Sequence, residues 1–292
     1  MNDYKNAVEI HGITKKYDGF TLNNVSFNVP KGSIMGFIGQ NGAGKTTTIR
    51  SILNIISIDS GEIKIFGMDH IKEEAAIKER IAVVFDELPF HDTFTAHNMA
   101  KIFRGIYKNW NDETYQNYLD RLQLPQKKKI GEFSKGMKMK LQIACALSHN
   151  AELLVMDEAT TGLDPVVRSE ILDIFLEYLQ DEDHSILMSS HITSDLEKIA
   201  DNVTFINRGE ILISGYKDKI LEDHGLLKCS KRDYKDIDPD DFVSARLNDF
   251  GAEILISDKK AMLKKYSGAV IDPVTLDEIM LYYVSKDKKE WR

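Results

Sequence analysis

The sequence has few cysteines and no long apolar run. Only Cys145 and Cys229 occur among the 292 residues, and Cys145 lies in an apolar helical pattern, which is typical of reduced, structural thiols rather than of a metal site. No apolar stretch approaches the ~18 residues that a membrane-spanning helix needs. The first residues, MNDYKNAVEIHG, have neither the cationic region nor the apolar run of a secretory signal. We therefore expect a cytosolic protein that reaches a membrane only through a partner.

Basic residues are also fewer than acidic ones. Lys and Arg number 38 against 46 Asp and Glu, which gives a net charge of −8 at pH 7. General nucleic-acid binding depends on neutralising phosphates with Lys and Arg, so this balance argues against a nucleic-acid partner. Hydrophobic residues make up 42% of the chain. A chain of this length can bury a sizeable core, in one large domain or in two.

The segment GQNGAGKTT, residues 39–47, has the spacing of a phosphate-binding loop. Gly39, Gly44, Lys45 and Thr46 match G-x-x-x-x-G-K-[ST] between an apolar strand pattern and an amphipathic helix pattern, which is the context that this motif requires. Backbone N–H groups and the positive end of the helix dipole would hold phosphates. Lys45 would reach the β and γ phosphates, and Thr46 would offer a hydroxyl to Mg²⁺. A turn that merely joins strand to helix is the alternative, and four matched positions disfavour it.

Strand-like and helix-like patterns alternate along the first 215 residues. The strand-like runs are AVEIHGI, TLNNVSFNV, IMGFIG, GEIKIFG, IAVVFD, ELLVMDE, SILMSSH and NVTFINRGEILISG. Alternation in residues 24–29 indicates a half-solvated antiparallel strand, whereas IMGFIG is typical of a strand buried on both faces. From about residue 90 to 150 the periodicity is helical, with one helix ending before Pro125. Helical patterns also cover residues 166–180 and 195–200.

The pattern changes again after Gly215, into an acidic segment of mixed character. Its middle, KRDYKDIDPDDF, is expected to be a boundary loop, and AEILISD and LDEIMLYYVSK indicate a strand and a terminal helix. We predict an α/β fold: a P-loop NTPase core with a mixed sheet, an antiparallel β subdomain and a helical insertion in residues 1–220. A small α/β accessory domain is predicted for residues 221–292.

Two adjacent acids, Asp157 and Glu158, end the strand-like run LLVMDE. One acid at the C-terminal end of such a strand can hold the Mg²⁺ shell, and the next can orient or deprotonate the water that attacks the γ-phosphate. A strand that happens to end in solvated acids is the alternative. Beside a phosphate-binding loop, the catalytic interpretation is favoured.

The segment FSKGMKMKLQIACALSHN, residues 133–150, predicts a helix with Ser134 as its N-cap. The N-terminus of this helix would present free N–H groups and a hydroxyl to an anion. Taken alone, this is an ordinary capped helix. Its spacing from the acid pair, followed by T-G-L-D and a histidine, favours a functional role.

These motifs, in this order, resemble those of the ATP-binding subunits of ATP-binding-cassette (ABC) transporters, over roughly the first 215 residues. Residues 39–46 look like the Walker A loop, LLVMDE like Walker B, and FSKGM like a divergent form of the signature L-S-G-G-Q. TGLDP resembles the D-loop at Asp164, and SSH resembles the switch histidine at His191. The short C-terminal domain and the S-K-G-M style of signature look most like the drug- and peptide-exporter branch.

The resemblance implies ATP and Mg²⁺ as cofactors and gives a role to each matched residue. The catalytic residues are expected to be Glu158, His191 and Lys45. The Mg²⁺ shell is expected to involve Thr46, Asp86 and Asp157. The residues expected to contact ATP are Tyr17, Gly39, Asn41, Gly42, Ala43, Gly44, Lys45, Thr46, Thr47, Ser134, Gly136 and Asp164. Tyr17 is placed where the family has an aromatic that stacks on adenine, and packing in the core is the alternative for its ring.

The sequence departs from the family pattern at two places. The family has Gln in the loop after IAVVF, whereas this chain has Asp86. We hypothesise that Asp86 still holds a water of the Mg²⁺ shell, with an altered metal dependence. The signature has Lys135 and Met137 at its third and fifth positions and retains Ser134 and Gly136. Of the six lysines in QKKKIGEFSKGMKMK, we expect Lys135 to lie near nucleotide.

The resemblance further implies two partners. Two nucleotide-binding subunits pack head to tail in this family, and each ATP lies between the Walker loop of one and the signature helix of the other. The chain carries one set of motifs, so it requires a second subunit, identical or related. Transmembrane permease subunits would carry the transported compound and dock near Asp86 and the helical insertion. The chain would then lie at the inner face of the cell membrane.

Two other functions compete with a transport ATPase. A regulatory or sensory module that binds ATP but barely hydrolyses it is suggested by Asp86 and the altered signature, while Glu158 and His191 argue against it. A cassette ATPase acting on ribosomes or DNA is the second. Ribosome-acting members generally carry two cassettes in one chain, and the interval between Lys45 and Asp157 has no room for the long coiled coil of the DNA-repair type.

Overall fold

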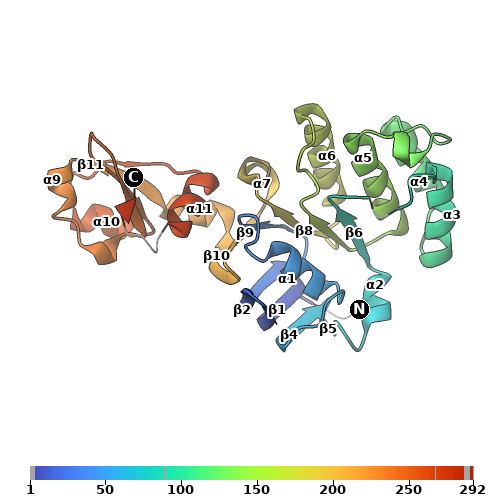
Figure 1. Ribbon diagram of the computed structural model, residues 1–292, viewed down its shortest axis with the longest axis horizontal. Helices are drawn as coiled ribbons and strands as arrows, with labels where there is room; N and C mark the ends of the chain where they lie inside the picture. The colour runs from blue at the N-terminus through green and yellow to red at the C-terminus, as the bar shows by residue number, and fades with distance from the viewer. Residues whose placement is uncertain (1–3, 89, 267, 286–289, 292) are drawn as a thin grey trace.

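The computed structural model describes residues 4–88, 90–266, 268–285 and 290–291. The chain is elongated, as Figure 1 shows, with its C-terminal part (orange and red) at one end and a group of helices from the middle of the sequence (green) at the other. The described residues form three sheets, of which the third lies in the C-terminal part. The predicted phosphate-binding loop lies where two of them come together.

The first sheet is antiparallel and has the order β2-β1-β4-β5. Its strands are β1 (Asn6–Tyr17), β2 (Phe20–Pro30), β4 (Ser60–Ile65) and β5 (Met68–Asp69). In β2, the alternation of Val25, Phe27 and Val29 with polar residues places the apolar side chains in the core and the polar ones in solvent. The predicted antiparallel, half-solvated strand is confirmed.

The second sheet is mixed and has the order β10-β9-β3-β8-β7-β6. Its strands are β3 (Ile34–Ile38), β6 (Ile81–Phe85), β7 (Leu153–Asp157), β8 (Ser185–Ser190), β9 (Asn202–Asn207) and β10 (Glu210–Tyr216). All pairs are parallel except β9 with β10. All five residues of β3 are buried, as expected for a central parallel strand covered on both faces.

Helix α1 (Lys45–Ile52) packs between these two sheets. Met35 and Phe37 of β3 belong to one hydrophobic cluster with Ile49 and Ile52 of α1 and with the inner residues of the antiparallel sheet. The neighbouring positions Ile34 and Ile38 point to the opposite face and join a second cluster. Successive side chains of β3 therefore pack into two clusters, one on each face of the mixed sheet. Because α1 belongs to one of these clusters, its first turn is held close to the end of β3.

The helical insertion lies between β6 and β7, at the far end of the mixed sheet (Figure 1). Its helices are α3 (Ala96–Ile106), α4 (Asp112–Arg121) and α5 (Lys135–Ala146), with short 3₁₀ turns at Ile130–Glu132 and Leu147–His149. Each long helix starts at a polar cap, Thr95, Asn111 or Ser134, whose side chain accepts a hydrogen bond from the third residue of the helix. The predicted insertion and the helix before Pro125 are confirmed.

Two further helices, α6 (Pro165–Tyr178) and α7 (Thr193–Ile199), cover the face of the mixed sheet opposite α1, in the cluster that contains Ile34 and Ile38. The short helix α2 (Glu74–Lys78) lies on the side of α1 and contributes Ile77 to its cluster. Helix α8 (Lys217–Asp223) follows β10 and spans the predicted division at residue 220, so that division stays a prediction.

The third sheet has the order β14-β11-β13-β12-β15. Its strands are β11 (Gly225–Cys229), β12 (Ser244–Leu247), β13 (Ala252–Ile256), β14 (Ile271–Asp272) and β15 (Glu290–Trp291). The helices around it are α9 (Lys231–Tyr234), α10 (Lys259–Lys265) and α11 (Leu276–Val284), with a 3₁₀ turn at Pro239–Asp241. Helix α11 contacts α7: Leu276 and Ile279 share a cluster with Leu196 and Ile199, and the Leu276 N–H donates to Glu197 Oε1 at 2.6 Å.

Two expectations about these strands are wrong. The run NVTFINRGEILISG is two strands, β9 and β10, because Arg208 and Gly209 adopt φ of 47° and 81° and reverse the chain. A Cβ on Gly209 would lie 1.9 Å from the Thr21 carbonyl oxygen, so this turn requires glycine. The segment KRDYKDIDPDDF is not a boundary loop. It lies inside the C-terminal part, between β11 and β12, which both pair with β13.

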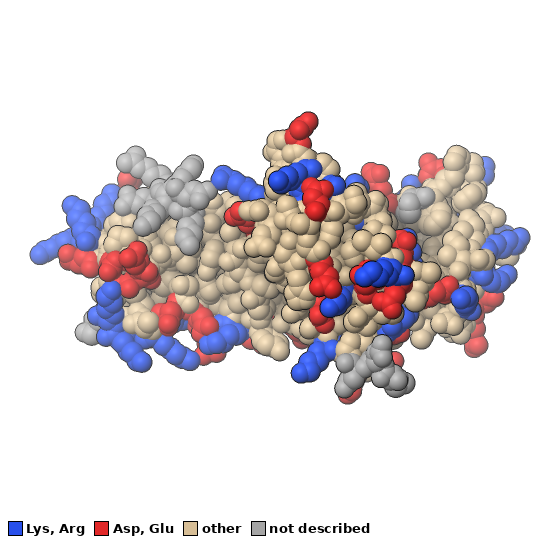
Figure 2. Space-filling view, turned by 90° about the horizontal axis from the view of Figure 1, so that it is seen from below, with Lys and Arg blue, Asp and Glu red and all other residues tan. Residues whose placement is uncertain are grey.

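Charges of both signs cover the surface. On the face drawn in Figure 2, basic and acidic side chains are interspersed rather than separated by sign. Many form ion pairs, such as Arg104 with Asp112 and Arg121 with Glu177. Within the described ranges, no helix has the length and apolar character needed to cross a membrane.

Candidate nucleotide site

The phosphate-binding loop leaves the end of β3 and enters α1 without a capping side chain. Gly44 is the N-cap, with φ of 115°, and it supplies no side-chain hydrogen bond to the first turn. The first amides of α1 and the positive end of its dipole are therefore directed at the loop. A Cβ on Gly39 would lie 2.5 Å from the Ile206 carbonyl oxygen. Asn41 and Gly42 are exposed at the tip of the loop, and Ala43 is buried.

Lys45 lies across this loop rather than in solvent. Its Nζ donates to the carbonyl oxygens of Gly39 at 2.6 Å and Gln40 at 3.2 Å, and it lies 2.9 Å from Glu158 Oε1. The Lys45 side chain is only 5% exposed and that of Glu158 17%. A carboxylate thus lies directly beside the cation that would contact a bound phosphate.

Glu158 connects the loop to the predicted switch histidine. Its Oε2 lies 2.7 Å from His191 Nδ1 and accepts a hydrogen bond from Thr161 Oγ1 at 2.9 Å. Burial works to raise the pKa of Glu158, but the hydrogen bonds and charges of Lys45, Thr161 and His191 together hold that pKa below its usual value. Glu158 is therefore ionised at neutral pH. The structure brings the three predicted catalytic residues together.

Ser189 orients both acids and was not predicted. Its hydroxyl donates to Asp157 Oδ1 at 2.7 Å and accepts from the Glu158 N–H at 3.1 Å. Asp157 of β7 is paired in register with Ser189 of β8, so the contact follows from the parallel sheet. The signal was present in the sequence, because Ser189 begins the same S-S-H run that contains His191. Glu158 itself adopts a left-handed conformation, with φ of 55°.

The two threonines after Lys45, Thr46 and Thr47, are half-buried in the first turn of α1. Asp157 is buried at the end of β7. Among the described residues, no group of three or more His, Cys, Asp or Glu side chains has the geometry to hold a metal.

Tyr17 is the last residue of β1, and 46% of its side chain is exposed. Lys15 Nζ lies 5.8 Å from the centre of its ring. Packing of this ring in the core, the alternative considered from the sequence, is therefore wrong. An exposed aromatic at this position leaves a ring face free for a planar base.

The other predicted residues form a second group, at the N-terminal ends of α5 and α6. Ser134 Oγ accepts from the Met137 N–H at 3.2 Å, as predicted for an N-cap. Asp164 caps α6 by accepting from the N–H groups of Val166 and Val167. Gly136 lies against Val167, since a Cβ on Gly136 would be 3.4 Å from a Val167 methyl. Asp86 lies here too, 2.5 Å from Lys135 Nζ.

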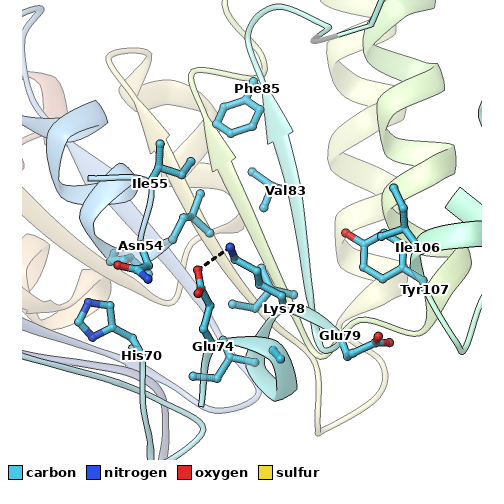
Figure 3. A pocket seen from close by; sticks show the side chains of 15 residues that line it. Asn54, Ile55, His70, Glu74, Lys78, Glu79, Val83, Phe85, Ile106 and Tyr107 are labelled. Carbon is cyan, nitrogen blue, oxygen red and sulfur yellow. Dashed lines mark ion pairs between the residues drawn. The ribbon is translucent and has the colours of Figure 1, made fainter. Parts of the chain in front are cut away.

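An apolar groove separates the antiparallel sheet from the helical insertion. Figure 3 shows Val83 and Phe85 of β6 at its base, Ile55 on one side, and Ile106 and Tyr107, at the end of α3, on the other. The cavity has a volume of about 350 Å³. Ile55 and Ile106 are more than half exposed. An ion pair between Glu74 and Lys78, 2.6 Å apart, lies among these lining side chains (Figure 3).

Comparison with known proteins agrees with this arrangement. The family model described as ABC transporter matches residues 22–161. The bacitracin transport ATP-binding protein BcrA of Bacillus licheniformis is 39% identical over 227 residues, which are 76% of this chain and 71% of that protein. The chain belongs to the ATP-binding subunits of ABC transporters. The linearmycin resistance ATP-binding protein LnrL of Bacillus subtilis, strain 168, is 34% identical over 216 residues, or 72% of this chain and 69% of that protein.

Solved structures of ABC subunits have the same fold. A structure described as the ATP-binding subunit of an ABC transporter has a TM-score of 0.67 and 26% identity, and the match covers 74% of this chain and 92% of that one. A nucleotide-free ATP-binding cassette gives a TM-score of 0.62 at 23% identity, covering 72% of this chain and 91% of that one. The chain is thus an ABC subunit that binds ATP, hydrolyses it and powers transport together with transmembrane components.

Proposed function

We propose that this subunit drives a drug- or peptide-type exporter by Mg²⁺-dependent ATP hydrolysis at the interface of two nucleotide-binding subunits packed head to tail. The observation that carries the proposal is the position of Glu158, which lies 2.9 Å from Lys45 Nζ and 2.7 Å from His191 Nδ1. A carboxylate that is ionised and held beside the phosphate-binding lysine is placed to act on a water at the γ-phosphate.

Each catalytic residue has a distinct task. With ATP in the loop, the γ-phosphate replaces Glu158 as the anion beside Lys45, and Glu158 is then free to orient or deprotonate the attacking water. His191 keeps the freed carboxylate in position and adds a donor towards the phosphate. Thr46 and Asp157 would hold Mg²⁺, which neutralises charge on the β and γ phosphates when bound. Ser189 fixes the Asp157 carboxylate through its 2.7 Å hydrogen bond.

The second subunit would complete the site. Ser134, Gly136 and Asp164 lie at the exposed N-terminal ends of α5 and α6, where amides and a hydroxyl can meet the phosphates of ATP bound to another chain. Loss of the γ-phosphate would remove the partner of these donors. The dimer would then open, which is the two-state change that a transport cycle needs.

The apolar groove is proposed as the site of a cytoplasmic helix of the permease. Its exposed Ile55 and Ile106 suit the apolar face of an amphipathic helix. Phe85, at its base, directly precedes Asp86, so an occupant would contact the loop that leads to the signature helix. Ile106→Asp should release the chain from the permease without changing ATP hydrolysis by the isolated chain. Leu263→Asp, an exposed apolar position on α10, is the matched control.

The type of transport follows from relatives. BcrA is named for bacitracin transport and LnrL for linearmycin resistance, which supports export of a peptide-like or drug-like compound by the assembly. Such a role places this subunit at the inner face of the cell membrane, held there by its permease. We keep the division into an ATPase domain, residues 1–220, and an accessory domain, residues 221–292, as part of this proposal.

The test is steady-state ATP hydrolysis by the purified chain as its concentration rises, with Glu158→Gln as control. We expect turnover per chain to rise with protein concentration and to fall by about 10² to 10⁴ in the variant, the size of general-base catalysis. Equal, residual hydrolysis by both proteins, in the presence of the permease and ATP, would support the regulatory alternative and overturn the catalytic proposal.

A further inference from the structure

The two positions at which the chain departs from the family pattern lie in contact with each other. Asp86 follows β6, and Lys135 is the first residue of α5, 49 positions later. Lys135 Nζ donates to Asp86 Oδ1 at 2.5 Å. In the family pattern, the loop position is a neutral Gln and the signature position is Gly. In this chain they are Asp86 and Lys135, whose opposite charges form an ion pair.

The backbone directly before Asp86 is hydrogen-bonded to α5. The side-chain amide of Gln142, in α5, donates to the Phe85 carbonyl at 3.0 Å and accepts from the Phe85 N–H at 3.2 Å. Gln142 is buried, so the residue before Asp86 is held directly against α5. The Asp86–Lys135 contact can consequently break by movement of the two side chains, with Phe85 still bonded to α5.

The surroundings of Lys135 show what else its charge can reach. A Cβ on Gly162, in the D-loop, would lie 3.5 Å from Lys135 Nζ. The lysine thus lies among three motifs: the loop after β6, the signature and the D-loop. The side chains of Lys135 and Asp86 are 45% and 43% exposed, so an anion from another molecule can approach. A cation in the first turn of α5 opposes the helix dipole and needs an anionic partner.

We infer that Asp86 is a positioning residue for Lys135: it holds the lysine in the nucleotide-free chain and releases it to the γ-phosphate of ATP bound in the second subunit. This inference rests on the head-to-tail dimer proposed above. Each closure breaks two such ion pairs, one per chain, and forms two lysine–phosphate contacts. Asp86 therefore sets the ATP concentration at which the dimer closes, and it acts through Lys135 rather than through Mg²⁺.

The test uses the full chain with Glu158→Gln, so that ATP is not consumed, and measures the dimer fraction by sedimentation against Mg²⁺-ATP concentration. Asp86→Asn should lower the concentration for half-closure by about two- to five-fold, the size expected for a half-exposed ion pair. Lys135→Met should raise it by about ten-fold or more, because a charge-assisted contact with phosphate is lost.

Two further variants separate the inference from a general charge effect. Asp86→Asn should have no effect when Lys135 is already Met. If it lowers the concentration equally in that background, simple repulsion between Asp86 and phosphate is the cause and the inference is wrong. Asp92→Asn is the matched control, since Asp92 pairs with Lys138 of the same helix at 3.5 Å. It removes the same charge and should leave closure unchanged.

A second measurement follows the lysine itself. Acylation of lysine amines, read by mass spectrometry, should modify Lys135 faster in Asp86→Asn than in the parent when nucleotide is absent, while Lys138 reacts equally in both. Added ATP should protect Lys135 in both proteins. If Glu158→Gln never dimerises, a dimer of two copies of this chain is ruled out, and release of Lys135 to a second copy falls with it. If dimers form but ATP leaves Lys135 as reactive as before, only the inference is overturned.

Discussion

Two lysine–carboxylate pairs on this chain have the same chemistry and opposite surroundings. Lys45 and Glu158 are almost enclosed, with 5% and 17% of their side chains exposed, and their other polar atoms bond to the loop carbonyls, Thr161 and His191. Lys135 and Asp86 are close to half exposed. The first pair belongs to the half of the site that a single chain completes. The second belongs to the half that, in the proposed dimer, faces another chain.

The difference lies in what each pair costs to break. An ion removed from water must keep its partner, since an uncompensated buried charge is strongly unfavourable. An exposed pair competes with water and salt and contributes little to folding. The buried pair is therefore suited to hold the catalytic residues ready for ATP, and the exposed pair is suited to exchange partners during a cycle.

The largest effect on stability is expected at the buried pair. Lys45→Met leaves the Glu158 carboxylate without its cation and should lower the free energy of unfolding by about 3 kcal/mol. Denaturant titration without nucleotide measures this. Adding Glu158→Gln to Lys45→Met should recover most of the loss. An additive loss in the double variant would show that the two side chains do not interact in the folded chain.

The exposed Tyr17 should affect ligand binding but not folding. Tyr17→Ala removes a ring that is expected to stack on adenine, a contact of ~1 to 3 kcal/mol per base, so ATP affinity should fall by about ten-fold or more. Affinities for ATP and for inorganic triphosphate, measured by calorimetry, provide the check. A parallel loss of triphosphate affinity would instead mean that the substitution disturbs the loop.

As the pH falls, the free energy of unfolding should decrease before the Lys45–Glu158 ion pair is affected. Burial is the main cause that lowers the pKa values of His70, His149 and His224 below the ordinary 6.5. The unfolded chain then binds more protons below pH 6.5, so stability should fall as the pH drops through that value, by up to about 1 kcal/mol per histidine.

The Glu158 carboxylate stays ionised through this window, because its pKa is lowered, and its contribution is lost only as the pH falls below about 4.5. Denaturant titrations at pH 7.5, 6.5 and 5.5 give the slope. His97→Gln, at an exposed position, should leave that slope unchanged. A flat profile between pH 7.5 and 5.5 would contradict the assignment of these three histidines as buried and neutral.

The smallest effect is expected at the exposed pair. Lys135→Met should change the free energy of unfolding by less than about 1 kcal/mol, although the same substitution at Lys45 is costly. Denaturant titration at low and high salt provides the measurement. A loss as large as that at Lys45 would remove the distinction between the two pairs.

The sequence predicted the first half of the site better than the second. Residues 39–46 are consecutive, and the strand, loop and helix around them follow from local sequence patterns. Asp157 and Glu158 come at the end of an otherwise apolar strand. The family resemblance put Glu158 and Lys45 in one catalytic site but did not predict their direct contact. The parallel pairing of β7 with β8 explains how Ser189 joins the two acids.

The second half depends on contacts between distant segments. Asp86 and Lys135 were each noted as departures, but nothing local to either residue indicates that they pair. Their meeting requires the Gln142 contact with β6 and the return of the chain through three helices. The turn at Arg208 and Gly209 was missed for a simpler reason: the two flanking strands form one nearly continuous apolar pattern.

The contact between α7 and α11 gives the C-terminal part a mechanical connection to the catalytic centre. Helix α7 starts at Thr193, two residues after His191, and its Leu196 and Ile199 are packed against Leu276 and Ile279. Packed interiors resist gradual deformation. If a binding partner tilts the third sheet, either α7 moves with it or the contact between α7 and α11 separates. The C-terminal part is therefore connected through α7 to His191, which contacts the proposed catalytic carboxylate, and we expect a force on that part to change the rate of hydrolysis.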